Sequence, residues 1–135
     1  MNFELPKRNM IFIINFLSGL TLPRKVSRAS SKLILSLQTK LSELAEDEKD
    51  LVKKYNGTVD EAGKISGVKP EDIKEFNEEH SELLNETVII NAAYKEQPKI
   101  LLDFFEEWNE QISPELIFGM NAFYDLLDSF NNKES

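Results

Sequence analysis

The chain has 135 residues, a net charge of −8 and no cysteine. It is long enough to bury a hydrophobic core, and the absence of cysteine excludes disulfides, a thiolate nucleophile and cysteine-based zinc sites. The charge is unevenly distributed, because residues 1–40 carry a net +6 and residues 41–135 a net −14. A chain polarised in this way presents two electrostatic surfaces, each suited to a different kind of partner.

Residues 1–22 predict a short extended arm followed by a buried helix. Asn2–Leu5 alternates polar and apolar side chains, and Pro6 suits the first turn of a helix that runs to about Leu20. This helix is apolar nearly all round, which is typical of a helix at the centre of a fold.

The same region imitates a secretory signal peptide, because Lys7 and Arg8 precede an apolar run. Glu4, Asn15 and the lack of a small-residue cleavage site argue against export. The run is also shorter than the ~20 apolar residues that a membrane-spanning helix needs. We therefore expect a protein that is neither secreted nor associated with a membrane.

Residues 23–87 predict a long antiparallel helical hairpin. Apolar side chains spaced three, four or seven residues apart predict one helix from about Arg24 to Tyr55, a rod of roughly 45–50 Å. The loop 56–69 contains three of the five glycines and suggests a small hairpin or another ordered excursion, after which Pro70 opens the returning helix. Residues 71–86 should then lie beside about 39–55.

Two C-terminal helices are predicted within 98–131, one beginning at Pro98 with its apolar side continuing to Ile112, and one beginning at Ser113-Pro114. Thr87–Asn91 is β-branched and either continues the hairpin or forms a strand paired with Asn2–Leu5. The whole chain, 1–135, is expected to form one mainly α domain. Its about five helices would surround the long hairpin, with a minor short pair of β-strands or a β-hairpin as an option.

The search for catalytic chemistry finds little. His80 is the only histidine, and its helical neighbours Phe76, Leu83 and Leu84 are apolar, which favours a partly buried structural role. The segment Asp60–Gly63 has the chemistry of a turn rather than the alternating oxygen ligands of a calcium loop. The glycines form no nucleotide-binding motif. We expect no enzymatic activity, no cofactor and no metal site.

A basic stripe occupies one face of the predicted second helix: Arg24, Lys25, Arg28 and Lys32. One interpretation is an anion or nucleic-acid contact, with the charges supported by free N–H groups at the helix start. The interpretation that we favour is internal pairing with carboxylates of the last two helices. The hairpin partner cannot supply these carboxylates, since it lies ~30 Å away along the helix.

An acidic face is predicted on the opposite half of the hairpin. Its members are Glu43, Glu46, Asp47, Asp50, Glu71, Glu75, Glu78, Glu79, Glu82 and Glu86. A solvated helix surface explains such a pattern most simply. The alternative is a surface shaped to bind a basic partner, in imitation of a nucleic-acid backbone.

The order of segments resembles a family of small uncharacterised proteins encoded by phages and prophages of Gram-positive bacteria. The resemblance rests on Asn15–Leu17, Leu22–Leu33, the acidic helix ending at Tyr55, the Asp60–Gly63 turn and Phe123–Leu127. It implies genes near tail and lysis functions, and it brings no catalytic residues.

Partner binding is the function that these features favour. The leading hypothesis is a non-enzymatic phage protein in the host cytoplasm. There it would act as an acidic inhibitor of a host nucleic-acid-handling or defence protein, including the anti-CRISPR type. The first alternative is a virion or tail-associated assembly protein, in which opposite charges drive homo-oligomerisation. The second alternative is nucleic-acid or anion contact through the basic stripe.

Overall fold

The computed structural model describes residues 2–134, and their side chains as far as Phe130. The helices and strands, in chain order, are β1 Asn2–Pro6, α1 Met10–Ser18, α2 Arg24–Lys54, β2 Thr58–Val59, β3 Ile65–Ser66, α3 Ile73–Asn85, β4 Thr87–Asn91, α4 Gln97–Glu107 and α5 Ile117–Glu134. Short 3-10 turns at 7–9, 70–72 and 114–116 lead into α1, α3 and α5. The mainly helical fold class predicted from the sequence is confirmed.

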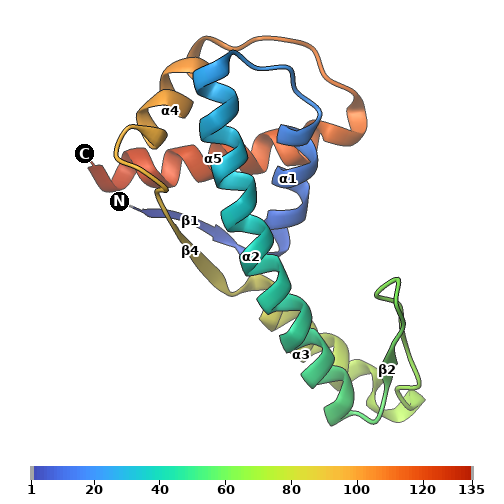
Figure 1. Ribbon diagram of the computed structural model, residues 1–135. Helices are drawn as coiled ribbons and strands as arrows, with labels where there is room; N and C mark the ends of the chain where they lie inside the picture. Colours follow the sequence, from blue (N-terminus) through green and yellow to red (C-terminus); the bar gives the residue numbers. More distant parts are fainter. Residues whose placement is uncertain (1, 135) are drawn as a thin grey trace.

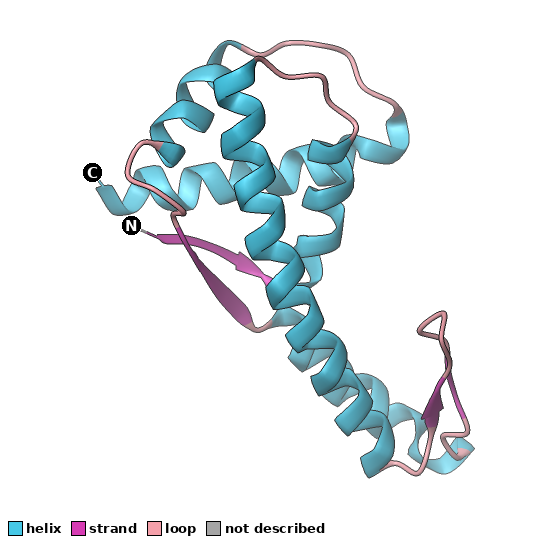
Figure 2. Ribbon diagram, in the orientation of Figure 1, coloured by secondary structure: helices cyan, strands magenta, loops and turns pink. Residues whose placement is uncertain are grey.

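The molecule consists of a body and an arm. The body contains α1, α4, α5, the first half of α2 and the β1–β4 sheet, while the second half of α2 projects outward with α3 and the β2–β3 hairpin (Figure 1). Helices make up most of both parts, and the strands are confined to two small antiparallel pairs (Figure 2). The 31 residues of α2 link the two parts as a single helix of about 46 Å.

The core of the body is built on aromatic side chains. Phe16 of α1 lies against Phe105 of α4 and Phe123 of α5, with ring centroids 6.5 and 5.9 Å away. The backbones of α1 and α5 approach closely at Gly119, where an added Cβ would lie 2.3 Å from the carbonyl oxygen of Phe12. Only glycine permits this approach, since any side chain would push the two helices apart.

A second, smaller core lies in the arm. Val52, Tyr55 and Phe76 are buried together, and partly buried side chains from the β2–β3 hairpin cover them. The rings of Tyr55 and Phe76 meet edge to face, 5.7 Å apart. This cluster is separate from the core of the body, so the arm has its own source of stability.

The segment Thr87–Asn91, left open between helix and strand, is a strand. β4 pairs antiparallel with β1, so that Phe3 lies opposite Ile90 and Leu5 opposite Val88. These four side chains are buried against the body. The alternation of buried and exposed residues is the period expected of a sheet with one covered face.

Two helices are shorter than predicted. α1 ends at Ser18 instead of about Leu20, because the chain turns at Gly19. α4 ends at Glu107, whereas its apolar pattern continues to Ile112, because Trp108 adopts an extended conformation. That change of direction lets the indole pack edge-on against Phe16, 5.8 Å away, and within 5.8 Å of Phe105. Nowhere along residues 2–134 is a helix both long and apolar enough to cross a bilayer.

Candidate functional site

A shallow, open acidic groove of about 380 Å³ lies between α2 and α3 in the arm. Its lining residues are Asp47, Asp50, Leu51, Glu79, Glu82, Leu83 and Glu86. Five carboxylates therefore surround it, and two partly buried leucines supply apolar surface. We call this feature the acidic groove.

Helical spacing explains why these residues share one surface. Asp47 and Asp50 are three positions apart on α2, Glu79, Glu82 and Leu83 follow at steps of three and one on α3, and Glu86 is the residue directly after that helix. Side chains three or four positions apart lie on the same face of a helix. Because α2 and α3 run antiparallel in the hairpin, the two acidic faces border the same groove.

Direct contacts set the register of the hairpin. Lys54 Nζ donates to Glu79 Oε1 at 2.8 Å, and the Tyr55 hydroxyl donates to the same oxygen at 2.9 Å. Nearer the body, His80 Nε2 and Glu48 Oε2 are hydrogen bonded at 2.6 Å. These contacts and the groove lining place residues 79–86 beside 47–55, the outer part of the predicted range 39–55.

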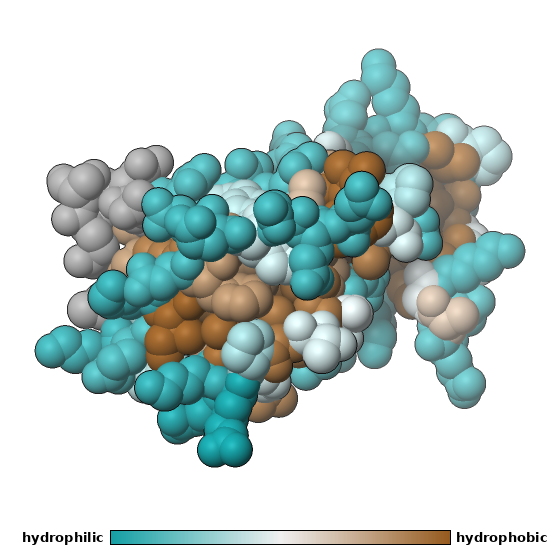
Figure 3. Space-filling model, turned by 90° about the horizontal axis from the view of Figure 1, so that it is seen from above, coloured by the Kyte–Doolittle hydropathy of each residue, from teal (hydrophilic) through white to brown (hydrophobic). Residues whose placement is uncertain are grey.

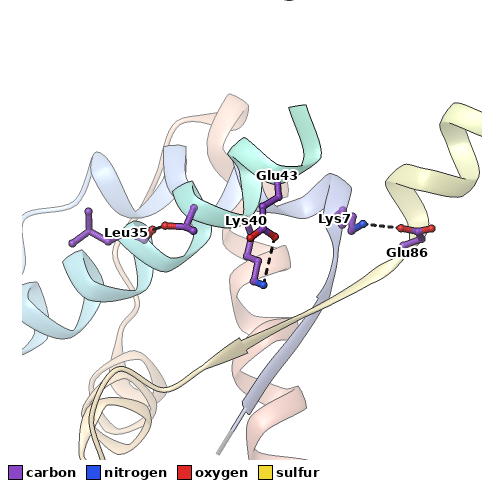
Figure 4. Close-up of polar contacts among 6 residues, drawn as sticks. Lys7, Leu35, Lys40, Glu43 and Glu86 are labelled. Atoms are coloured by element: carbon purple, nitrogen blue, oxygen red, sulfur yellow. Dashed lines mark hydrogen bonds and ion pairs between the residues drawn. The ribbon is translucent and has the colours of Figure 1, made fainter. Parts of the chain in front are cut away.

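The inner end of the arm is tied to the start of the chain. Lys7 Nζ pairs with Glu86 Oε1 at 2.7 Å, and the Lys7 backbone N–H donates to the Glu86 carbonyl at 2.9 Å (Figure 4). Glu86 is therefore the groove residue through which the hairpin is anchored to the body.

Glu79 and Tyr55 influence each other's ionisation. The hydrogen bonds from Lys54 and Tyr55 hold the pKa of Glu79 below its ordinary value of 4.5. Burial of the Tyr55 ring, together with the hydrogen bond to Glu79, raises the pKa of Tyr55 to about 12. The contact thus favours an ionised glutamate next to a neutral tyrosine.

This pairing predicts a defined pH window for the stability of the arm. The Tyr55 contribution is fully present below its unfolded pKa of 10.0 and is lost as the pH rises toward the folded pKa of about 12. The Glu79 contribution is present above 4.5 and is lost as the pH falls through its lowered folded pKa. Thermal unfolding of the wild type and Tyr55→Phe across pH 9–12 should show a steeper loss of stability in the wild type. Equal slopes would contradict the assignment.

The structure brings only part of the predicted acidic face together. Glu43 pairs with Lys40 along α2 at 3.5 Å, as Figure 4 shows, and Glu46 pairs with Lys49 at 3.5 Å. The remaining exposed members, Glu71, Glu75 and Glu78, do not line the groove. Within the groove, Asp47, Asp50 and Glu82 have no ion pair with any side chain described between 2 and 130.

Sequence reasoning missed some of these contacts. His80 stacks on Phe76 as its apolar neighbourhood suggested, but its hydrogen bond to Glu48 was not foreseen. Glu48 lies 32 positions away, so only the register of the hairpin reveals the pair. Asp60 behaves as predicted for a turn, since its Oδ1 accepts hydrogen bonds from the backbone N–H groups of Ala62 and Lys64. No cluster suited to a metal ion occurs within the described part of the chain.

The favoured internal pairing of the basic stripe is not found. Arg24, Lys25, Arg28 and Lys32 are all exposed, and none lies within 4.0 Å of a carboxylate among the side chains described through Phe130. The physical reason is that the nearby charged and aromatic side chains make other contacts. Lys99 of α4 pairs with Asp103, while the Arg28 guanidinium lies 4.8 Å from the centre of the Tyr94 ring.

The body carries a second hollow, of about 410 Å³, between α4 and α5. Asp103, Glu106 and Asp128 rim it, and Leu102, Tyr124 and Leu127 supply apolar surface. Seen from the end of the body where α2 begins, apolar surface gathers in the middle and hydrophilic side chains surround it (Figure 3). Carboxylates beside an apolar surface therefore occur in the body as well as in the arm.

The fold and the groove define a small, mainly helical protein whose projecting arm carries an acidic surface. The chain belongs to a family of proteins of unknown function, DUF1617, whose family model matches residues 9–134. No curated protein and no solved structure matches the chain significantly.

Proposed function

We propose that this protein acts by binding a basic surface of another protein in its acidic groove. The observation that carries the proposal is the grouping of five carboxylates around one shallow groove, of which Asp47, Asp50 and Glu82 have no ion-pair partner among the described side chains. Carboxylates gathered in this way produce a negative potential that accelerates the approach of a basic partner and selects its orientation.

The shape of the groove also suits lysine and arginine. Leu51 and Leu83 offer apolar surface for the methylene stems of these residues, while the carboxylates lie close enough to receive the charged ends. Proteins that handle nucleic acid carry clustered lysine and arginine for phosphate contact. We therefore propose a nucleic-acid-handling or defence protein of the host as the partner, bound and inhibited in the host cytoplasm by a phage-encoded protein.

Reversing the three unpaired carboxylates should abolish this binding. The variant Asp47→Lys, Asp50→Lys and Glu82→Lys alters exposed side chains without breaking an internal ion pair. The matched control, Glu107→Lys, Glu110→Lys and Asp125→Lys, makes the same change in net charge on exposed sites of the body. Each protein would be used to capture partners from host lysate, with identification by mass spectrometry and titration of the recovered partner.

We expect the wild type and the control variant to bind the same basic protein, and the groove variant to bind it at least ~100-fold more weakly, because close interfacial charge pairs carry coupling energies of several kcal/mol. Affinity should fall as salt is raised. Equal affinity of the groove variant and the wild type would refute the groove as the binding surface. An equal loss in the control would show that net charge alone matters.

A second candidate function follows from the unpaired basic stripe. Four exposed cations at the start of α2, where the first turn has no acidic residue, favour contact with phosphates. The change Arg24→Gln, Arg28→Gln and Lys32→Gln should then abolish binding of a fluorescent DNA duplex. In the wild type, log affinity should fall linearly with log salt. Absence of binding by the wild type at low salt would eliminate this candidate.

A further inference from the structure

The two-stranded sheet of the body has one covered edge and one open edge. At the covered edge, the backbone N–H of Glu4 in β1 donates to Ser129 Oγ of α5 at 3.0 Å. This N–H points away from β4, so Glu4 and its partner Ile89 form a non-hydrogen-bonded pair of the antiparallel ladder. The N–H and C=O of Ile89 therefore point away from β1, toward the outer edge of β4.

The same reasoning applies to the residues two positions away on each side. Thr87, Ile89 and Asn91 alternate with Val88 and Ile90, so their main-chain groups also face outward. Across residues 2–134, no backbone hydrogen bond satisfies the outward groups of these three residues. In Figure 1, β4 lies at the border of the body, on the side of β1 that faces away from α5.

This edge also lacks the features that usually prevent strands from associating. Natural proteins protect open edges with charged side chains, proline or bulges. The segment Thr87–Asn91 contains no charge and no proline, and Ile89 remains 48% exposed on its outer face. An uncharged, β-branched edge with unsatisfied main-chain groups is well suited to receiving another strand.

We propose that β4 pairs antiparallel with β4 of a second copy, around a two-fold axis at Ile89, to form a continuous four-stranded sheet. This register places Ile89 opposite its own copy and Thr87 opposite Asn91. All the residues with outward-facing main-chain groups then form hydrogen-bonded pairs, each of which exchanges two hydrogen bonds. Val88 and Ile90 keep their place on the buried face, so no side chain has to change sides.

The faces of the strand agree with this direction. Antiparallel pairing about this axis keeps the buried faces of both sheets on the same side, whereas parallel pairing of the two open edges would turn them to opposite sides. Charge at the strand ends does not set the direction, because Glu86 is already paired with Lys7 at 2.7 Å and Lys95 is followed directly by Glu96. The five residues of β4 are uncharged, so the paired strands themselves bring no like charges together.

Charge substitutions at the two-fold axis provide the test. Ile89→Lys and Ile89→Glu each place like charges directly opposite one another, which destabilises a cross-strand pair. Each variant alone should be monomeric, with a dimer dissociation constant raised at least ~10-fold, a change of 1.4 kcal/mol. An equimolar mixture should restore a dimer, because Lys and Glu then face each other across the axis. The control Phe118→Lys changes an apolar residue that is 54% exposed elsewhere, and it should dimerise like the wild type.

Analytical ultracentrifugation over a salt series would measure these states, with circular dichroism to verify folding. The wild type should have twice the chain mass of 15.5 kDa and should associate more strongly at high salt, because salt screens the repulsion between two chains of net charge −8. A monomeric wild type would overturn the proposal and leave the edge for a strand of another protein. Loss of the dimer with rising salt would indicate contact between the basic and acidic ends. Failure of the mixture to dimerise would exclude the β4 axis.

Discussion

Replacing Phe105 with alanine should lower the free energy of unfolding by about 3–5 kcal/mol, the range observed when a large aromatic side chain is removed from a packed core. Phe105 is 1% exposed, and its ring lies 4.8 Å from that of Phe123 and 5.0 Å from that of Phe104. It connects α4 to α1 and α5, so the surrounding side chains have few ways to fill the cavity. Urea denaturation followed by circular dichroism would measure the change.

The matched control for this prediction is Phe118→Ala. Phe118 is 54% exposed and contacts Phe12 edge to face at 4.7 Å, so little buried volume is lost when it is truncated. We expect a change of about 1 kcal/mol or less. Similar losses in the two variants would mean that the aromatic cluster of the body does not determine its stability.

Replacing Phe76 with alanine should destabilise the arm without unfolding the body. Phe76 is 6% exposed and packs between Tyr55 and His80, with ring centroids 5.7 and 5.6 Å away. Loss of the largest apolar residue of such a small cluster should cost about 3 kcal/mol, which is enough to open a region stabilised by few buried contacts. The acidic groove should be lost with it, because α3 forms one of its sides.

Amide hydrogen exchange would test this separation. In Phe76→Ala, protection should fall along α3 and the last turns of α2, while the amides of α1 and α5 keep their wild-type protection. Binding of the basic partner should weaken in parallel. Uniform loss of protection over both parts would show that the body and the arm unfold as one cooperative unit.

The elements that could be predicted from the sequence are those with a local signal. The apolar period of α2, the proline before α3 and the turn at Asp60–Gly63 all depend on neighbouring residues, and the structure confirms them. The ends of α1 and α4 were wrong by two to five residues. At α4 the extended backbone at Trp108, whose ring packs against Phe16, determined where the helix ends.

The candidate site was predictable only in part. The acidic character of the hairpin is a property of composition, and helical spacing explains which residues of one helix share a face. Which acids meet across the two helices depends on the register, and that is set by Lys54, Tyr55 and Glu79. Helical spacing indicates that Glu43 and Glu46 can pair along α2, each with a lysine three positions away, whereas the position of Glu71 outside the groove depended on the register.

The sequence by itself determined the helical class, the long hairpin and the uneven distribution of charge, because periodicity and charge are counted along the chain. Only the tertiary structure decided whether the basic stripe is neutralised, which carboxylates form a groove and which edge of the sheet stays open. Each of these depends on distances between segments far apart in sequence. These contacts form over a few ångströms in space. Local sequence patterns determine which side chains share one face of a helix or strand, but not which other element that face contacts.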